Sequence, residues 1–150
     1  MGKIKKGFGK VFLPAILILF GFCQASQAQE SGLWVVVKKG GPLEGLSLKE
    51  IRQVYLGDKQ YVGQTKVLSL YNGDKRASKA FLDQVLKKTQ AEYRGVWAAK
   101  VFQEGLETPS VLASSRDIAR MVADNDAAIG FIYSADVPKD GMQNLSVIYP

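Results

Sequence analysis

Two uninterrupted apolar runs constrain the fold of this chain more than any other feature. Residues 33–37 and 128–133 lack the alternation of apolar and polar side chains that marks a strand with one face in water. Each run therefore predicts a strand that is covered on both faces. Such strands occur mainly in α/β proteins, where helices pack against both sides of a largely parallel sheet.

Amphipathic segments separate these strands and predict the covering helices. Ser47 and Glu50 form a capping box before one helix, which Gly57 ends, and Thr89 begins a second capping box. Ser114 or Ser115 is expected to cap a later helix. Shorter strands are predicted at residues 67–70, 110–113 and 145–149. The alternation predicts one α/β domain with helices on both faces of a mostly parallel sheet.

Large aromatic residues are predicted to anchor the core beneath the helix that Thr89 begins. The spacing of Tyr93, Trp97 and Phe102 places them on the expected buried face of this helix. We expect Trp97 to pack against the sheet together with Phe81 and Phe102. Large aromatics at this spacing are more often core residues than a ligand platform.

The N-terminal residues have the three-part layout of a secretory signal peptide. Residues 1–10 contain four lysines and no acid, residues 11–22 are apolar, and small residues at Ser26 and Ala28 suit cleavage before Gln29. We therefore predict a signal peptide at residues 1–28 and a periplasmic domain at residues 29–150. An uncleaved anchor and a lipoprotein modified at Cys23 are the alternatives. The apolar run is short for a membrane span, and Phe22 is bulky for a lipobox.

Charge and composition exclude several classes of function. The chain has 20 basic and 14 acidic residues, but four lysines belong to the predicted signal, so the mature excess is 16 minus 14, or +2. Nucleic acid is therefore not expected as a partner. The sequence contains no histidine, which removes the usual general base and the usual zinc ligand. We expect no cofactor and no metal.

The segment from Lys66 to Lys88 carries the candidate site. A short apolar strand ends at a turn that contains Asn72 and Gly73, and an amphipathic helix follows, with Phe81, Leu82, Val85 and Leu86 on its buried face. In an open α/β sheet, such a loop lies at the carboxyl end of a strand, where helix N–H groups favour an anion. Lys38, Lys39 and Arg116 could face the same crevice, although each of them is more often a solvated surface residue.

Four segments, in this order, resemble those of phosphate-type substrate-binding proteins of bacterial ABC importers. Residues 47–59 resemble the family's helix that leads into an FLGK motif, and residues 66–81 resemble its strand, anion loop and helix. Residues 93–109 resemble its tryptophan helix with a trailing proline, and residues 127–133 resemble its PGAIGYV strand. The resemblance implies a single lobe of a type II periplasmic-binding-protein fold. Full-length relatives have two such lobes, with the anion clamped between them.

The resemblance also implies where an anion would bind. The corresponding loop residues in this sequence are Asn72, Gly73, Lys75, Arg76 and Ser78. Tyr71 stands about where the family has an arginine, and residues 74–77 replace its Ser-Gly-Thr core. A single lobe offers one wall to the ligand, which leaves the anion half in water. We therefore predict a weak or degenerate oxyanion site.

Three functions from different classes follow from these observations. The first is an exported, non-enzymatic solute-binding-like domain for phosphate or another small oxyanion. The second is a protein-interaction module that uses the same lobe to dock a transporter or sensor partner. The third, an enzyme with a Ser–Lys dyad at residues 74–78, has no support beyond the proximity of these residue types.

Overall fold

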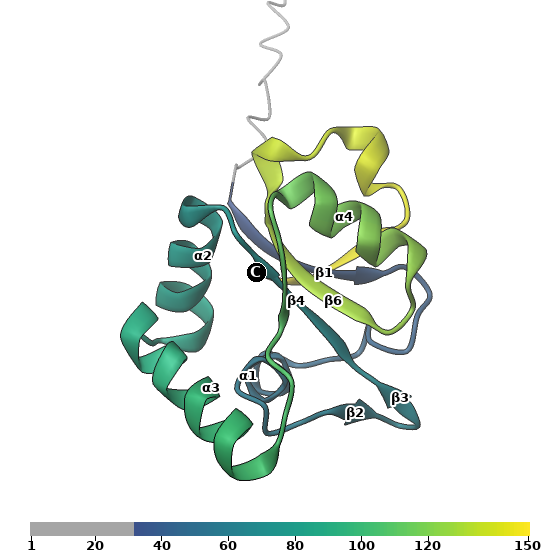
Figure 1. Cartoon of the computed structure of the whole chain (residues 1–150). Helices are drawn as coiled ribbons and strands as arrows, with labels where there is room; N and C mark the ends of the chain where they lie inside the picture. The colour runs from purple at the N-terminus through teal and green to yellow at the C-terminus, as the bar shows by residue number, and fades with distance from the viewer. Residues whose placement is uncertain (1–31) are drawn as a thin grey trace, which may run out of the picture.

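The structure is a computed structural model that describes residues 32–150 (Figure 1). The predicted signal peptide at residues 1–28, its cleavage site and Cys23 lie outside the described residues. Within the described part of the chain, no helix is long and apolar enough to cross a bilayer.

A five-stranded sheet forms the centre of the domain, in the order β5-β4-β6-β1-β7. Its strands are β1 (Leu33–Lys38), β4 (Leu68–Asn72), β5 (Ser110–Leu112), β6 (Ala128–Tyr133) and β7 (Leu145–Tyr149). β4 pairs in parallel with β5 and β6, whereas β1 pairs antiparallel with β6 and β7. Four strands therefore run in one direction and β1 runs against them, which confirms the mostly parallel sheet.

The reversed direction of β1 corrects one expectation about the basic residues. Lys38 ends β1 and Lys39 follows it, so both lie at the edge opposite to the carboxyl ends of β4 and β6. Lys38 forms an ion pair there with Asp126, which precedes β6, at 2.6 Å. These two lysines do not face the crevice at which β4 ends.

Helices cover both faces of the sheet, as predicted. They are α1 (Leu48–Tyr55), α2 (Lys75–Phe81), which continues into the π-helical turn η1 (Leu82–Leu86), α3 (Gln90–Glu104) and α4 (Ser115–Asp124). Figure 1 shows α2 and α3 on one side of the sheet and α4 on the other. Alternate residues of β1 divide between the two cores: Val35 and Val37 pack with Phe81 and Phe131, and Val36 packs with Ile118 on α4.

The helix boundaries follow the capping chemistry of the sequence. The Ser47–Glu50 and Thr89–Glu92 capping boxes are both formed, and Ser114 caps α4. Gly57 follows Leu56, the C-cap of α1, and has φ +77°, a conformation that favours glycine. These elements were predictable because each cap depends only on residues within one turn of it.

The core position of Trp97 is confirmed, but the prediction for Phe102 is wrong. Trp97 is buried beside Phe81 in the same cluster, and its Nε1 donates a hydrogen bond to the carbonyl of Tyr55 at 3.0 Å. Phe102 is 91% exposed. Five residues along an α-helix turn the side chain by about 140°, which carries Phe102 away from the face that Trp97 buries.

Some short elements escaped the sequence analysis. The residues between α1 and β4 form a hairpin, β2 (Tyr61–Val62) and β3 (Thr65–Lys66), which the sequence did not predict. After β6 the chain makes two 3₁₀ turns, η2 (Ser134–Asp136) and η3 (Lys139–Met142), before β7. The turn η2 brings Asp136 to the carboxyl edge of the sheet.

Candidate functional site

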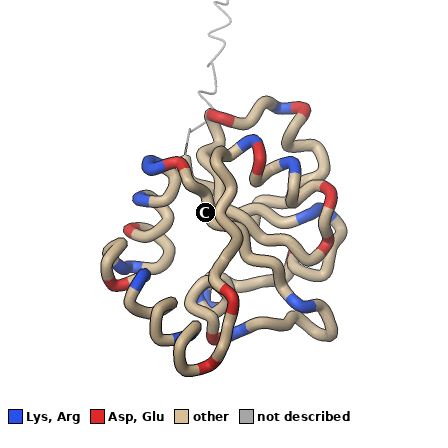
Figure 2. The backbone as a smooth tube through the Cα atoms, viewed as in Figure 1, with Lys and Arg blue, Asp and Glu red and all other residues tan. Residues whose placement is uncertain are grey.

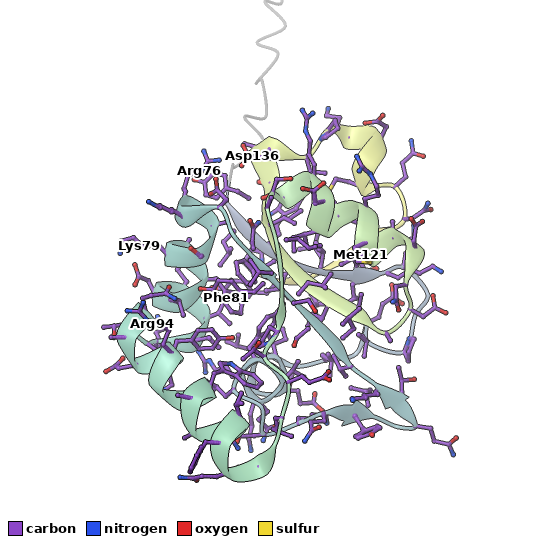
Figure 3. All side chains as sticks on the ribbon, viewed as in Figure 1. Arg76, Lys79, Phe81, Arg94, Met121 and Asp136 are labelled. Atoms are coloured by element: carbon purple, nitrogen blue, oxygen red, sulfur yellow. The ribbon has the colours of Figure 1, made fainter. Side chains whose placement is uncertain are left out.

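A shallow, open crevice of about 430 Å³ lies at the carboxyl edge of the sheet. The starts of α2 and α4 and the turn η2 after β6 form its walls. Its lining consists of Asp74, Arg76, Ser114, Ser115, Arg116, Ala135 and Asp136. Figure 3 shows Arg76 and Asp136 close together at this edge, one from α2 and the other from η2. This is the position that the sequence predicted for a ligand crevice.

Asn72, at the end of β4, holds the floor of the crevice together. Its side chain is fully buried, and Nδ2 donates hydrogen bonds to Ser115 Oγ at 3.0 Å and to the carbonyl of Phe131 at 3.1 Å. Its Oδ1 accepts the backbone N–H of Asp74 at 2.9 Å. Asn72 therefore ties β4 to β6, to α4 and to its own loop, and its amide has no exposed surface to offer a ligand.

Gly73 is also occupied by contacts within the protein. Its N–H donates to the carbonyl of Leu112 at 2.7 Å, and a Cβ at this position would lie 3.1 Å from that oxygen. The glycine lets the β4–α2 loop approach the end of β5 closely. Its N–H is therefore not available to an anion in this structure.

Asp74 places the protein's own carboxylate at the start of α2. Its Oδ1 accepts the N–H of Ala77 at 2.9 Å, and its carbonyl accepts the N–H of Ser78 at the same distance. The bond from Ala77 to the Asp74 carboxylate is the N-cap bond, which satisfies one of the free N–H donors at the start of the helix. A bound anion at this position would have to compete with a carboxylate that is covalently held in place.

Of the five residues predicted to bind an anion, Arg76 alone lines the crevice. Its guanidinium forms an ion pair and a hydrogen bond with Asp136, and its Cζ lies 4.1 Å from the centroid of the Tyr133 ring. The bond to Asp136 raises the pKa of Arg76 above its ordinary value. Figure 2 shows acidic and basic residues side by side where α2 begins.

Arg116, at the start of α4, approaches the crevice from the opposite wall. Its Nε donates to the carbonyl of Asp136 at 3.2 Å, so η2 lies between the two arginines. With Asp74 and Asp136, the lining holds two cations and two anions. The crevice has guanidinium donors suited to an oxyanion, but its formal charge is already balanced.

The structure does not bring all five predicted residues to one place. Arg76 lines the crevice, and Asn72 and Gly73 lie beneath it. Lys75 and Ser78 line a different groove, between α2 and the start of α3. The Ser78 hydroxyl donates to the carbonyl of Lys75 at 3.2 Å.

Asp136 and Ser115 were not predicted to lie at the site, although Ser115 was a candidate cap of α4. Ser115 is buried, and its Oγ accepts hydrogen bonds from Asn72 Nδ2 and from the N–H of Tyr133. A signal for Asp136 existed, because it follows a strand that was predicted to run parallel to β4. Its partner Arg76 is 60 residues away in the sequence, and no local pattern links the two.

The described residues contain no group of three histidine, cysteine or acidic side chains that could hold a metal ion.

No family model and no curated protein matches the sequence. The informative similarities are to solved structures. One is a protein of Clostridium perfringens, described as a phosphate ABC transporter substrate-binding protein and solved with bound phosphate, at 22% identity and a TM-score of 0.56. Another is PstS of Borrelia burgdorferi, at 14% identity and a TM-score of 0.56.

The fold is shared with phosphate-binding proteins. The matches cover 79% and 80% of this chain but only 44% and 49% of the two solved chains. This chain thus spans about half the length of the proteins that it matches. The similarity agrees with the predicted single lobe of a type II periplasmic-binding-protein fold, and at these identities it bears on the fold alone.

Proposed function

We propose that the protein is an exported, non-enzymatic, solute-binding-like module whose crevice holds a small oxyanion such as phosphate only weakly. The observation that carries this proposal is the ion pair between Arg76 and Asp136. The guanidinium that would bind an oxyanion already binds a carboxylate of the same chain. The shared fold, including a neighbour with bound phosphate, supports the ligand class.

The balance of charges explains why binding is expected to be weak. An oxyanion that binds Arg76 must displace Asp136, so one charge-assisted hydrogen bond replaces another with little net gain. The remaining donors are exposed to water, where each net hydrogen bond contributes about 0.5–1.5 kcal/mol. After the cost of association, a dissociation constant of millimolar order or weaker is expected.

We also propose where the protein acts and what kind of protein it binds. The signal predicted at residues 1–28 directs the domain to the periplasm, where phosphate and the membrane proteins that import or sense it are accessible. A transporter or sensor is therefore the expected protein partner. Neither nucleic acid nor a cofactor is part of the proposal.

The chemistry of the available groups supports the non-enzymatic part of the proposal. The whole sequence has no histidine, and the Ser78 hydroxyl directs its proton to a backbone carbonyl rather than to an amine. A Ser–Lys dyad requires the hydroxyl to donate to a neutral lysine. The contact with the Lys75 carbonyl therefore supports a non-enzymatic module over the dyad considered for residues 74–78.

One observation favours the protein-interaction alternative. Arg76 lies over the ring of Tyr133, and its side chain remains 53% exposed at the rim of the crevice. Arginine and tyrosine are enriched among the residues that dominate binding energy in protein interfaces. If no oxyanion binds, docking of a transporter or sensor protein against this crevice becomes the preferred function.

Titration of the protein with phosphate and with sulfate, followed by NMR, tests the proposal. We expect saturable shifts at the Arg76 side chain and at the amides of residues 114–116. Arg76→Ala should weaken binding about tenfold or more, because it leaves two carboxylates and one cation around the crevice, and these repel an oxyanion. Lys79→Ala, which removes a cation from the same helix outside the crevice, is the matched control and should bind like wild type. Shifts that stay linear into tens of millimolar in every variant would favour the docking alternative.

A further inference from the structure

A pocket of about 260 Å³ lies at the opposite end of the domain from the crevice. Its walls are the end of α1, the β3–β4 segment, Trp97 of α3 and residues 106–110, which lead into β5. In Figure 1 these elements meet at the lower end of the molecule, whereas α2 begins at the upper end. The pocket and the crevice share no lining residue, so they are separate sites.

One wall of the pocket is an open stretch of sheet edge. Leu68 donates its N–H to the carbonyl of Ala127, on the β6 side, at 2.8 Å. Because the backbone groups of successive strand residues point to opposite neighbours, the N–H of Ser69 and the carbonyl of Val67 point to the β5 side. β5 pairs with β4 only from Leu70 onward, and within residues 32–150 neither group has a hydrogen-bond partner. The wall therefore presents a free donor and a free acceptor.

This gap in the sheet edge is short. At one end, Val67 donates its N–H to the carbonyl of Gln60 at 2.8 Å. At the other end, β5 begins with Ser110, which is paired with Leu70. A ligand between these two points can use the Ser69 N–H and the Val67 carbonyl, but a longer added strand would meet residues that already pair with β4. The gap therefore favours a ligand of single amino-acid size over an extended peptide.

The charged residues of the lining are complementary to a zwitterion. They are Lys59, Lys66 and Glu107. Lys59 is paired with Glu50 at 2.9 Å. Lys66 and Glu107 are exposed and come from different walls, and neither forms an ion pair within the described part of the chain. The lining thus offers one unpaired cation and one unpaired anion.

Apolar side chains form another part of the lining, with Val54, Trp97 and Leu106 among them. The indole of Trp97 is held by its bond to the carbonyl of Tyr55. A Cβ at Gly57 would lie 3.1 Å from Cη2 of Trp97 and 3.4 Å from Cδ1 of Leu106, so these two side chains meet at the end of α1. An apolar lining with a few convergent polar groups is the usual form of a small-molecule site.

We propose that this pocket binds a free α-amino acid with an apolar side chain. The ammonium of the ligand donates to the carbonyl of Val67, and its carboxylate accepts the N–H of Ser69. The unpaired charges of Glu107 and Lys66 balance those of the ammonium and the carboxylate. The aliphatic part of the ligand leaves water against the apolar lining. For so small a ligand in an open pocket, we expect a dissociation constant of about 0.1–1 mM.

Titration of the purified protein with leucine, followed by NMR, tests the proposal. We expect saturable shifts at the Ser69 amide and at the indole N–H of Trp97, and slower hydrogen exchange at Ser69 in the complex. The matched probes are 4-methylpentanoate, which lacks the ammonium of leucine, and 3-methylbutylamine, which lacks its carboxylate. Each should bind about tenfold or more weakly than leucine, because a charge-assisted bond is lost.

Variants of the two unpaired charges test their part in binding. Lys66→Gln and Glu107→Gln should each weaken leucine binding about two- to fivefold, as expected for exposed charges. Lys139→Gln and Asp140→Asn make the same changes of charge at exposed residues of η3 outside the pocket, and should bind leucine like wild type. Arg76→Ala should also bind leucine like wild type, since Arg76 lines the crevice. Circular dichroism should show that all of these variants remain folded.

Three results would overturn the proposal. One is the absence of saturable shifts at Ser69 up to tens of millimolar leucine. Another is binding of 4-methylpentanoate or 3-methylbutylamine as tightly as leucine, which would show an apolar pocket that does not recognise amino acids. The third is equal weakening in the pocket variants and in the η3 variants, which would show that net charge rather than this pocket governs binding.

Discussion

Asn72 is expected to contribute more to stability than any other polar side chain at the crevice. The substitution Asn72→Ala removes the two hydrogen bonds from Nδ2 and the one to Oδ1. Ser115 Oγ keeps the N–H of Tyr133, but the carbonyl of Phe131 and the N–H of Asp74 lose these bonds. The side chain that made them is fully buried.

The expected cost follows from those two groups. A buried donor or acceptor without a partner costs about 1–3 kcal/mol, and the part-buried N–H of Asp74 belongs at the lower end, so Asn72→Ala should lower the free energy of unfolding by about 2–4 kcal/mol. That is a large share of the ~5–15 kcal/mol that holds a domain folded. Ser78→Ala, which removes one hydroxyl bond within α2, should change it by less than about 0.5 kcal/mol.

Urea denaturation followed by tryptophan fluorescence measures the difference. With a slope near 2 kcal/mol/M, the Asn72→Ala midpoint should fall by about 1–2 M while the slope stays unchanged. Equal midpoints for Asn72→Ala and Ser78→Ala would show that the buried amide is not the crosslink between β4, β6 and α4. The crevice floor would then not depend on this amide.

Two further predictions concern the packing of α4 and the cap of α1. Gly130→Ala should destabilise the protein by about 1–3 kcal/mol, because the new Cβ would overlap Cγ2 of Ile118. Gly45→Ala adds a Cβ where the space is open, and it is the control in the same urea assay. Bonds from the Ser47 backbone and then from Lys59 lower the pKa of Glu50 from 4.5 to about 2. A lowered pKa stabilises the folded state above the unfolded value, so the stability advantage of wild type over Glu50→Gln should shrink as pH falls from about 4.5 towards 2. An advantage that does not change over this range would contradict the assignment.

Local chemistry made much of the fold predictable. The bounds of β6 and β7 and the caps of α1 and α3 matched the expectation because apolar runs and capping boxes act within a few residues. The direction of β1 was not predictable in this way. Strand direction depends on which strands become neighbours, and β1 pairs with two strands from the far end of the chain.

The site was predictable in its position but not in its balance of charge. The strand–loop–helix pattern placed the crevice at the end of β4, and Arg76 lines it. A sequence pattern does not show that Asn72 points inward or that Lys75 and Ser78 face another groove. Nor does it show that Asp136 comes from the other end of the domain to bind Arg76.

The most direct test of the proposed function is to release Arg76 from its internal partner. Asp136→Asn removes the competing carboxylate, and Asp83→Asn makes the same change of net charge by freeing Lys79 outside the crevice. Phosphate affinity, measured by calorimetry for wild type and both variants, should rise about tenfold or more in Asp136→Asn only, since a charge-assisted bond becomes available. Equal affinities in the two variants, or no phosphate binding by Asp136→Asn, would contradict the claim that a self-balanced oxyanion site lies in this crevice.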